Sequence, residues 1–85
     1  MVDLEKGIEY LQEEFWMVME KDQDGYFECR IPIGWFSELV VRTGLSEDWF
    51  DVEDSWIGDE EAYLFYVKSD GLEELCSRLS KEMEA

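Results

Sequence analysis

A stripe of apolar residues predicts that the chain begins with an amphipathic helix. Apolar side chains recur at steps of three and four, which places them on one face of a helix: Leu4, Ile8, Leu11, Phe15 and Val18. Asp3 is a suitable N-cap, and Trp16 and Met17 lie beside the stripe, so the buried face widens toward the end of the helix. We expect the helix to run over residues 4–21, because Gly25 then provides the positive φ that such a reversal needs.

The pattern then changes to strict alternation. Between residues 26 and 33 apolar side chains occupy every second position: Phe27, Cys29, Ile31 and Ile33. This alternation predicts a half-buried strand. Pro32 is the only proline and has no backbone N–H, so it places the end of this strand at a sheet edge or marks where pairing stops.

Residues 35–44 are compatible with two structures. Phe36, Leu39 and Val40 suit a short helix that ends at Gly44, whereas the β-branched side chains of the same segment suit a strand. We favour the helix.

Two more strands and a final helix complete the pattern. Residues 49–52 and 62–68 are predicted as strands, and the second is apolar on both faces, which is typical of a central strand. Asp70 is suited to cap the last helix, with Glu73 three residues later as in a capping box. The apolar stripe of that helix continues to the C-terminus: Leu72, Leu75, Cys76, Leu79 and Met83.

This order of elements predicts a single α+β domain over residues 1–85. Its small antiparallel sheet has about three strands, and the N- and C-terminal helices pack on one face.

The charge balance bears on partners rather than on the fold. Of the 85 residues, 23 are Asp or Glu and 7 are Lys or Arg, which gives a formal net charge of -16 at pH 7. Such a charge repels nucleic acid and anionic membranes and attracts cations and basic proteins. We therefore expect a divalent cation or a basic protein as partner, with no direct nucleic acid and no membrane. The oligomeric state stays open, and a merely solubilising surface is the simpler alternative.

The residues that are missing exclude several kinds of chemistry. The chain has no histidine, so it has no Ser-His or Cys-His nucleophile pair and no His-containing zinc site. No glycine-rich phosphate loop is present, and so small a domain leaves little room for a substrate cleft. We therefore expect a protein without enzymatic activity.

Cysteine usage and the lack of long apolar runs indicate the setting. The isolated Cys29 and Cys76 predict buried thiols in a reducing compartment, with a disulfide between them as the alternative. The first residues do not form a signal peptide, and no run approaches the roughly 18 apolar residues that span a membrane. We expect a cytoplasmic location.

Residues 20–31, with the sequence EKDQDGYFECRI, form the most specific local motif. This stretch resembles the calcium loop of the EF-hand family, in which oxygens at positions 1, 3, 5, 7, 9 and 12 bind Ca²⁺ around a glycine at position 6. A helix entering the loop also matches the family, and Gly25 falls at the turn position. The resemblance implies five ligands at matching positions: Glu20, Asp22, Asp24, Glu28 and the backbone carbonyl of Tyr26.

The motif departs from the family in two places. Position 12 is Ile31 rather than a bidentate glutamate, and position 1 is Glu20 rather than an aspartate. The segment is therefore either a degenerate calcium loop that borrows a carboxylate from elsewhere or a helix-to-strand turn without metal.

A second acidic run, between residues 47 and 61, contains candidates for the borrowed carboxylate. Asp54, Asp59 and Glu60 could gather near the tip of a hairpin, where they would bind a divalent ion or complete the ligand set of the first loop, and the alternative is that they are solvated. Trp49 and Trp56 interrupt this run and are expected in the core more than at a contact surface.

As a whole, the chain resembles small acidic hypothetical proteins of methanogenic archaea. The resemblance rests on MVDLEKGIEYLQEEF followed by EKDQDGYFECRIP. It implies a compact α+β fold, a cytoplasmic setting and calcium binding.

Two functional hypotheses result. The first is a non-enzymatic acidic protein that binds Ca²⁺ weakly through residues 20–28. The alternative is an acidic interaction module or DNA mimic that docks on a basic nucleic-acid-binding protein, with Glu5, Glu9 and Glu13 of the first helix contributing to its acidic face.

Overall fold

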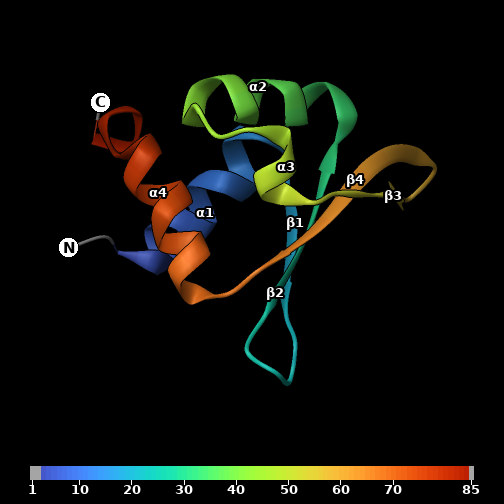
Figure 1. The fold of residues 1–85 in the computed structure, drawn as a ribbon, viewed down its shortest axis with the longest axis horizontal. Coiled ribbons are helices and arrows are strands. Elements are labelled where there is room, and N and C mark those ends of the chain that lie inside the picture. Colours follow the sequence, from blue (N-terminus) through green and yellow to red (C-terminus); the bar gives the residue numbers. More distant parts are fainter. Residues whose placement is uncertain (1–2, 85) are drawn as a thin grey trace.

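The chain folds into an antiparallel sheet of four strands, with its helices gathered to the left of and above the strands in Figure 1. The structure is a computed structural model and describes residues 3–84. Its elements in chain order are α1 (Leu4–Glu14), β1 (Val18–Lys21), β2 (Phe27–Pro32), α2 (Ile33–Thr43), α3 (Glu47–Phe50), β3 (Glu53–Ile57), β4 (Glu60–Val67) and α4 (Ser69–Glu84). The predicted α+β class is confirmed, with four strands in place of about three.

The first helix is shorter than its apolar stripe predicts. Asp3 caps it as expected, accepting hydrogen bonds from the backbone N–H groups of residues 5 and 6, but the helix ends at Glu14 and residues 18–21 form β1. The expected helix over residues 4–21 is therefore wrong in its second half. Phe15, Met17 and Met19 are also spaced by two, as in a strand. Of these three residues Met19 lies in β1, where it pairs with the buried Cys29.

The strand order is β1-β2-β4-β3, and every neighbouring pair is antiparallel. Cys29 lies opposite Phe65, and both side chains are buried on the face that the helices cover. The apolar strand β4 lies between β2 and β3, so its predicted central position is confirmed. Pro32 forms the last pair of β2, opposite Ala62, as its missing N–H predicts.

Residues 49–52 are not a strand, and this expectation is wrong. Trp49 and Phe50 belong to the short helix α3, and β3 begins after it, at Glu53. Tertiary packing accounts for the difference, because Phe50 inserts its ring between Phe36 and Phe65, with centroid distances of 5.2 and 5.0 Å. A strand through Phe50 would lose these contacts.

Helix α2 and helix α4 have the predicted positions. Residues 35–44, whose sequence suits either a helix or a strand, belong to helix α2. This helix ends at Gly44, which has a left-handed conformation. Helix α4 begins at Ser69, so Asp70 lies in the first turn and accepts a hydrogen bond from the N–H of Gly71 instead of capping the helix from outside. Among the described residues no hydrogen bond joins Glu73 to the start of α4, so the predicted capping box is wrong.

Cysteine placement and helix hydropathy bear on the setting of the protein. Cys29 and Cys76 are both buried and free, which confirms the prediction of buried thiols over a disulfide. Burial raises the pKa of the Cys29 thiol to about 12, with Glu28 adding to the effect, so this thiol stays protonated at neutral pH. None of the helices within residues 3–84 is long and apolar enough to cross a membrane.

Candidate docking face

The residues of the predicted calcium loop form the turn of the β1–β2 hairpin. A strand leads into this turn, whereas the EF-hand resemblance implies a helix. One carboxylate oxygen of Asp22 accepts hydrogen bonds from the N–H groups of Asp24 and Tyr26, each at 2.9 Å. The carbonyl of Tyr26 accepts the N–H of Asp22 at 2.8 Å. Two of the expected ligand groups are thus engaged in holding the turn itself.

Other residues of the predicted calcium loop lie beside positively charged side chains. Glu28 is paired with Arg30 at 2.9 Å and lies directly across the hairpin from Glu20. Two ammonium groups lie beside the loop, with Lys68 Nζ 5.0 Å from the ring centroid of Tyr26 and Lys21 Nζ 5.8 Å from that of Phe27. These positive charges oppose the approach of a divalent cation.

The carboxylates expected to complete the ligand set lie at the other end of the sheet. Asp54 pairs with Tyr63 and so lies level with Ile31, which is roughly 13 Å along β2 from Phe27 at the rise of a strand. Asp59 lies still further, in the turn between β3 and β4. No group of three His, Cys, Asp or Glu side chains is placed to hold a metal ion within the described part of the chain. Calcium binding stays a prediction.

The sheet has a second face, here called the outer face, which points away from the helices. Its members are in register across the four strands: Val18, Glu20, Glu28, Arg30, Pro32, Glu53, Ser55, Ile57, Glu60, Ala62, Leu64 and Tyr66. Arg30 lies near its centre, where it pairs with Glu28 and donates to the hydroxyl of Ser55 at 3.2 Å. Around it, exposed Val18 and Tyr66 leave apolar surface open to solvent.

One end of the outer face is hollowed into a groove of about 210 Å³. Five residues line this groove, which we call the tryptophan groove: Trp16, Pro32, Trp35, Ile57 and Glu60. They come from three places in the fold, namely the α1–β1 connection, the β2–α2 junction and the β3–β4 hairpin. Trp16 is 65% exposed and Trp35 is 36% exposed, so both indoles present large surfaces to solvent.

The two tryptophans are held in different ways. Trp16 follows the last turn of α1 with φ +55°, a left-handed conformation that glycine adopts easily and a bulky residue does not. This conformation turns the chain from the helix into β1. Trp35 lies in the first turn of α2 and packs edge-to-face on the buried Phe15, with centroids 6.3 Å apart. The second wall of the groove is therefore anchored in the core.

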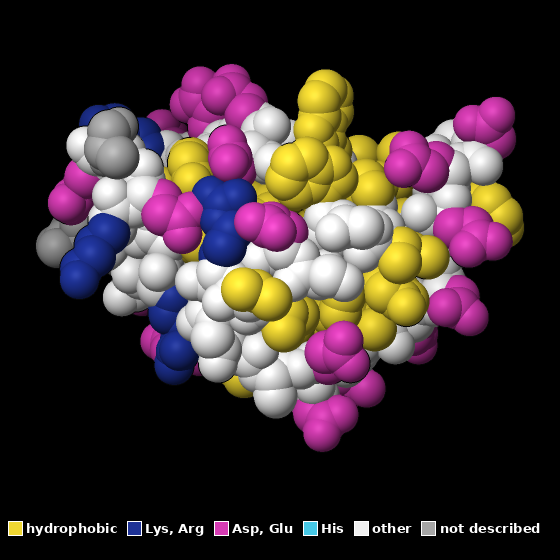
Figure 2. Space-filling view, turned by 90° about the horizontal axis from the view of Figure 1, so that it is seen from above, with side chains coloured by type: hydrophobic (Ala, Val, Ile, Leu, Met, Phe, Trp, Pro, Cys, Tyr) yellow, Lys and Arg dark blue, Asp and Glu magenta, His cyan; other side chains and the backbone are white. Residues whose placement is uncertain are grey.

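The surface around these aromatic groups is strongly acidic. Every arginine of the chain is already paired with a carboxylate inside the fold, at Arg30, Arg42 and Arg78. Figure 2 views the molecule from above, where α2 lies in Figure 1. In this view the Lys and Arg side chains are few and lie among acidic ones, and hydrophobic side chains lie in the centre and on the right. An apolar surface bordered by carboxylates complements a basic, partly apolar partner.

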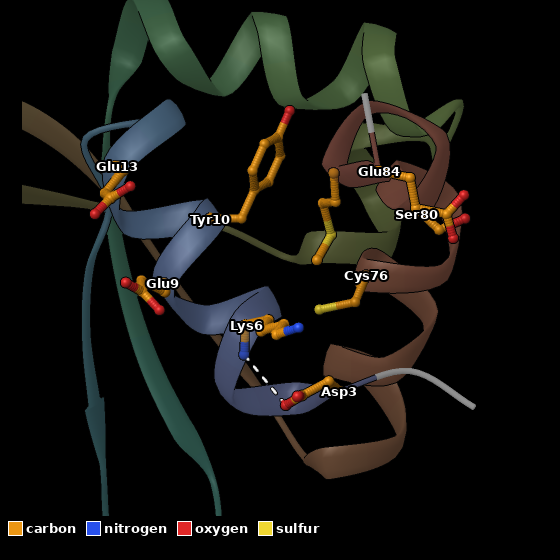
Figure 3. Close-up of a pocket in the computed structure, with 9 residues that line it drawn as sticks. Asp3, Lys6, Glu9, Tyr10, Glu13, Cys76, Ser80 and Glu84 are labelled. Carbon is orange, nitrogen blue, oxygen red and sulfur yellow. Dashed lines mark hydrogen bonds between the residues drawn. The ribbon is translucent and has the colours of Figure 1, made fainter.

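A larger hollow, of about 530 Å³, lies between α1 and α4. Its floor is the close approach of the two helices, where Gly7 leaves room for the Cys76 sulfur. Figure 3 shows the carboxylates of Glu9 and Glu13 directed away from Cys76, so the acidic groups of this hollow do not converge on one point. Burial also raises the pKa of the Cys76 thiol, which therefore stays protonated. This arrangement offers no evident chemistry.

Arg42 forms the most densely bonded polar cluster. Its guanidinium group lies over the ring of Phe15, with its central carbon 4.7 Å from the centroid. It donates to Glu82 of α4, to Glu14 of α1 at 3.1 Å and to the hydroxyl of Tyr10 at 2.9 Å. The hydrogen bond from Arg42 holds the pKa of Glu82 below its ordinary value. Only 19% of the Arg42 side chain is exposed, so this cluster joins helices and is no open site.

The pattern of residues in the sequence does not predict the tryptophan groove. Trp16 was expected on the buried side of a longer helix, and Trp56 in the core, yet they are 65% and 56% exposed. Both expectations are wrong, whereas Met17, placed beside Trp16, is buried as expected. Comparison with protein-family models, curated protein sequences and solved structures finds no match.

Proposed function

We propose that this domain is a non-enzymatic acidic docking module, which binds a basic protein through the outer face of its sheet. The single observation that carries the proposal is the tryptophan groove, where two exposed indoles lie beside a carboxylate in a chain of net charge -16. Exposed aromatic groups bordered by charge are typical of protein contact surfaces. The free thiols of Cys29 and Cys76 support the cytoplasmic setting that we also propose.

The geometry favours docking on a basic protein over imitation of a nucleic acid backbone. Glu5, Glu9 and Glu13 do lie on the exposed side of α1, in helical steps of four residues. Four helical residues advance about 6 Å, whereas double-stranded DNA carries one charge per roughly 1.7 Å of axis. That row is therefore much less densely charged than DNA.

The test compares two triple variants of equal net charge. The first removes three carboxylates from the outer face, by Glu20→Gln, Glu53→Gln and Glu60→Gln. The second removes three from α1, by Glu5→Gln, Glu9→Gln and Glu13→Gln. The probe is a lysine- and arginine-rich peptide that contains one leucine, and its affinity is measured by fluorescence anisotropy at low and physiological salt.

We expect the outer-face triple variant to bind this peptide about tenfold more weakly than the parent, from three exposed ion pairs of about 0.5 kcal/mol each. The α1 triple variant should lose no more than about twofold, through the weaker overall field. Equal losses in the two variants would show that the peptide senses only net charge, and they would refute docking on the outer face.

A further inference from the structure

We propose that the tryptophan groove binds the side chain of an arginine from the basic partner. This inference rests on the proposed docking function and names the residue that the outer face recognises. Three properties of the groove support it, namely its size, its walls and its charge.

The size of the groove fits one side chain. Its volume of about 210 Å³ lies below the roughly 300–1,000 Å³ of sites that hold free small molecules. The groove is also open to solvent at Trp16, which is 65% exposed, so a side chain projecting from another protein can enter it. An anchor residue of a partner is therefore a better match than a free metabolite.

The walls and the charge select a guanidinium group. The faces of indole rings attract cations and stack on the planar guanidinium, while Pro32 and Ile57 provide apolar contact for the methylene stem. Glu60 lies at the same groove and forms no ion pair with any described residue. A carboxylate accepts two parallel hydrogen bonds from arginine, which a lysine ammonium group cannot provide in that geometry.

The protein already contains one arginine held in this manner. Arg42 lies with its guanidinium carbon 4.7 Å from the centroid of the Phe15 ring and donates to carboxylates from two other helices. Trp35 forms a T-shaped ring contact with the same Phe15, so the internal arginine site and the tryptophan groove are adjacent. The tryptophan groove likewise has aromatic rings and a carboxylate acceptor, but no described Lys or Arg side chain occupies it.

The experiment uses the full chain and three lysine-rich peptides that differ at one central position. This position holds arginine, its uncharged isostere citrulline, or leucine. Affinity is followed by tryptophan fluorescence, and the indole N–H resonances of Trp16 and Trp35 report whether the groove is occupied. The domain variants are Trp16→Gly and Glu60→Gln. The matched control for Trp16→Gly is Trp56→Ala, at an exposed tryptophan outside the groove. The matched control for Glu60→Gln is Glu61→Gln, because Glu61 is the next residue along the chain and its side chain lies on the other face of the sheet.

We expect the arginine peptide to bind the parent about tenfold more tightly than the citrulline peptide, and to shift both indole resonances. Trp16→Gly and Glu60→Gln should each remove most of this preference. Trp56→Ala and Glu61→Gln should retain it within about twofold.

The outcomes separate this inference from the function on which it rests. Equal affinities for the three peptides, or a tighter leucine peptide, would overturn the arginine site while docking itself still stood. A preference for arginine that survives both Trp16→Gly and Glu60→Gln would place the recognition elsewhere and would also overturn it. If none of the three peptides binds, the docking function and the arginine site both fail.

Discussion

Trp16 combines a conformational cost with exposure. Its φ of +55° belongs to the left-handed region, which is unfavourable for a large residue, and its side chain is 65% exposed, so little core packing compensates. Glycine is the residue that commonly follows a helix end in this conformation, and this chain uses Gly44 in that way after α2. The presence of tryptophan at position 16 is therefore better explained by binding than by stability.

We therefore expect Trp16→Gly to leave the free energy of unfolding nearly unchanged. Relief of the left-handed strain gains about 1 kcal/mol, and the greater freedom of glycine in the unfolded chain offsets a similar amount. Urea denaturation measures the free energy of unfolding of the variant. A loss of more than about 2 kcal/mol would mean that Trp16 is a structural residue, and the functional explanation of its conformation would be wrong.

Asp22 and Asp24 have different roles despite their similar positions. The Asp22 carboxylate accepts two backbone N–H groups within the hairpin turn, and we expect Asp22→Ala to destabilise the protein by about 1–2 kcal/mol. Asp24 is exposed, so Asp24→Ala is the matched control with an expected change near zero. Thermal melts with and without Ca²⁺, against sodium chloride of equal ionic strength, provide the measurement.

The calcium-loop hypothesis predicts the opposite pattern in these melts. If the two carboxylates share a cation, each substitution relieves repulsion in the metal-free protein and abolishes a saturable stabilisation by Ca²⁺. A parent that calcium stabilises beyond the salt control, with both variants insensitive to it, would therefore support calcium binding over the turn role of Asp22.

Among the elements, α1, α2 and α4 are joined through Arg42. Replacing it by glutamine leaves Glu82 and Glu14 without their cation and removes the contact over Phe15, so we expect a loss of about 1–3 kcal/mol. The hydrogen bond from Arg42 keeps the pKa of Glu82 below its ordinary value of 4.5, so the native state holds this carboxylate ionised. The stability contributed by Glu82 is thus complete above pH 4.5 and is lost as the pH falls through the lowered value.

Denaturation of the parent and of Arg42→Gln at pH 7 and at several acidic pH values tests this prediction. The difference in unfolding free energy between the two proteins should shrink as the medium becomes acidic, because protonated Glu82 no longer gains from the cation. A difference that stays constant down to pH 3, far below the ordinary pKa, would contradict the ion-pair role.

Secondary structure is predicted correctly where the spacing of apolar residues fits either a helix or a strand, but not both. The alternation around Cys29 and the stripe of α4 each allow a single structure, and both are confirmed. The pattern around Phe15 fits both a helix and a strand, because steps of two and of three are both present, and only the pairing of β1 with β2 decides between them. At Phe50 the local preference for strand is outweighed by ring packing against Phe36 and Phe65.

The tryptophan groove is harder to predict than the helices and strands, because it depends on contacts between distant parts of the chain. The tryptophan groove joins Trp16, Trp35 and Glu60, which are far apart in sequence and have no shared spacing. Their proximity depends on the early end of α1 and on the position of the β3–β4 hairpin, and both differ from the predicted arrangement. The calcium motif was visible because it is local, yet its residues have mainly turn-forming partners.

At the scale of the whole molecule, the proposed docking function depends on how aromatic and charged groups are distributed over the surface. The helices bury one face of the sheet, and the outer face keeps exposed apolar groups within a chain whose formal net charge is -16 at pH 7. Electrostatic attraction brings a basic partner to every side of such a surface, but apolar and stacking contacts are available only where the aromatic groups lie. Binding should therefore weaken with salt while its location on the protein stays the same.

The most direct test of this central claim is a backbone amide shift map of the isotope-labelled domain, titrated with the arginine peptide at physiological salt. The account predicts saturable shifts concentrated in β1, in the β2–α2 junction and in the β3–β4 hairpin, together with the indole resonances of Trp16 and Trp35. Shifts spread evenly over all acidic segments, with α1 and α4 responding as strongly as the outer face, would contradict it.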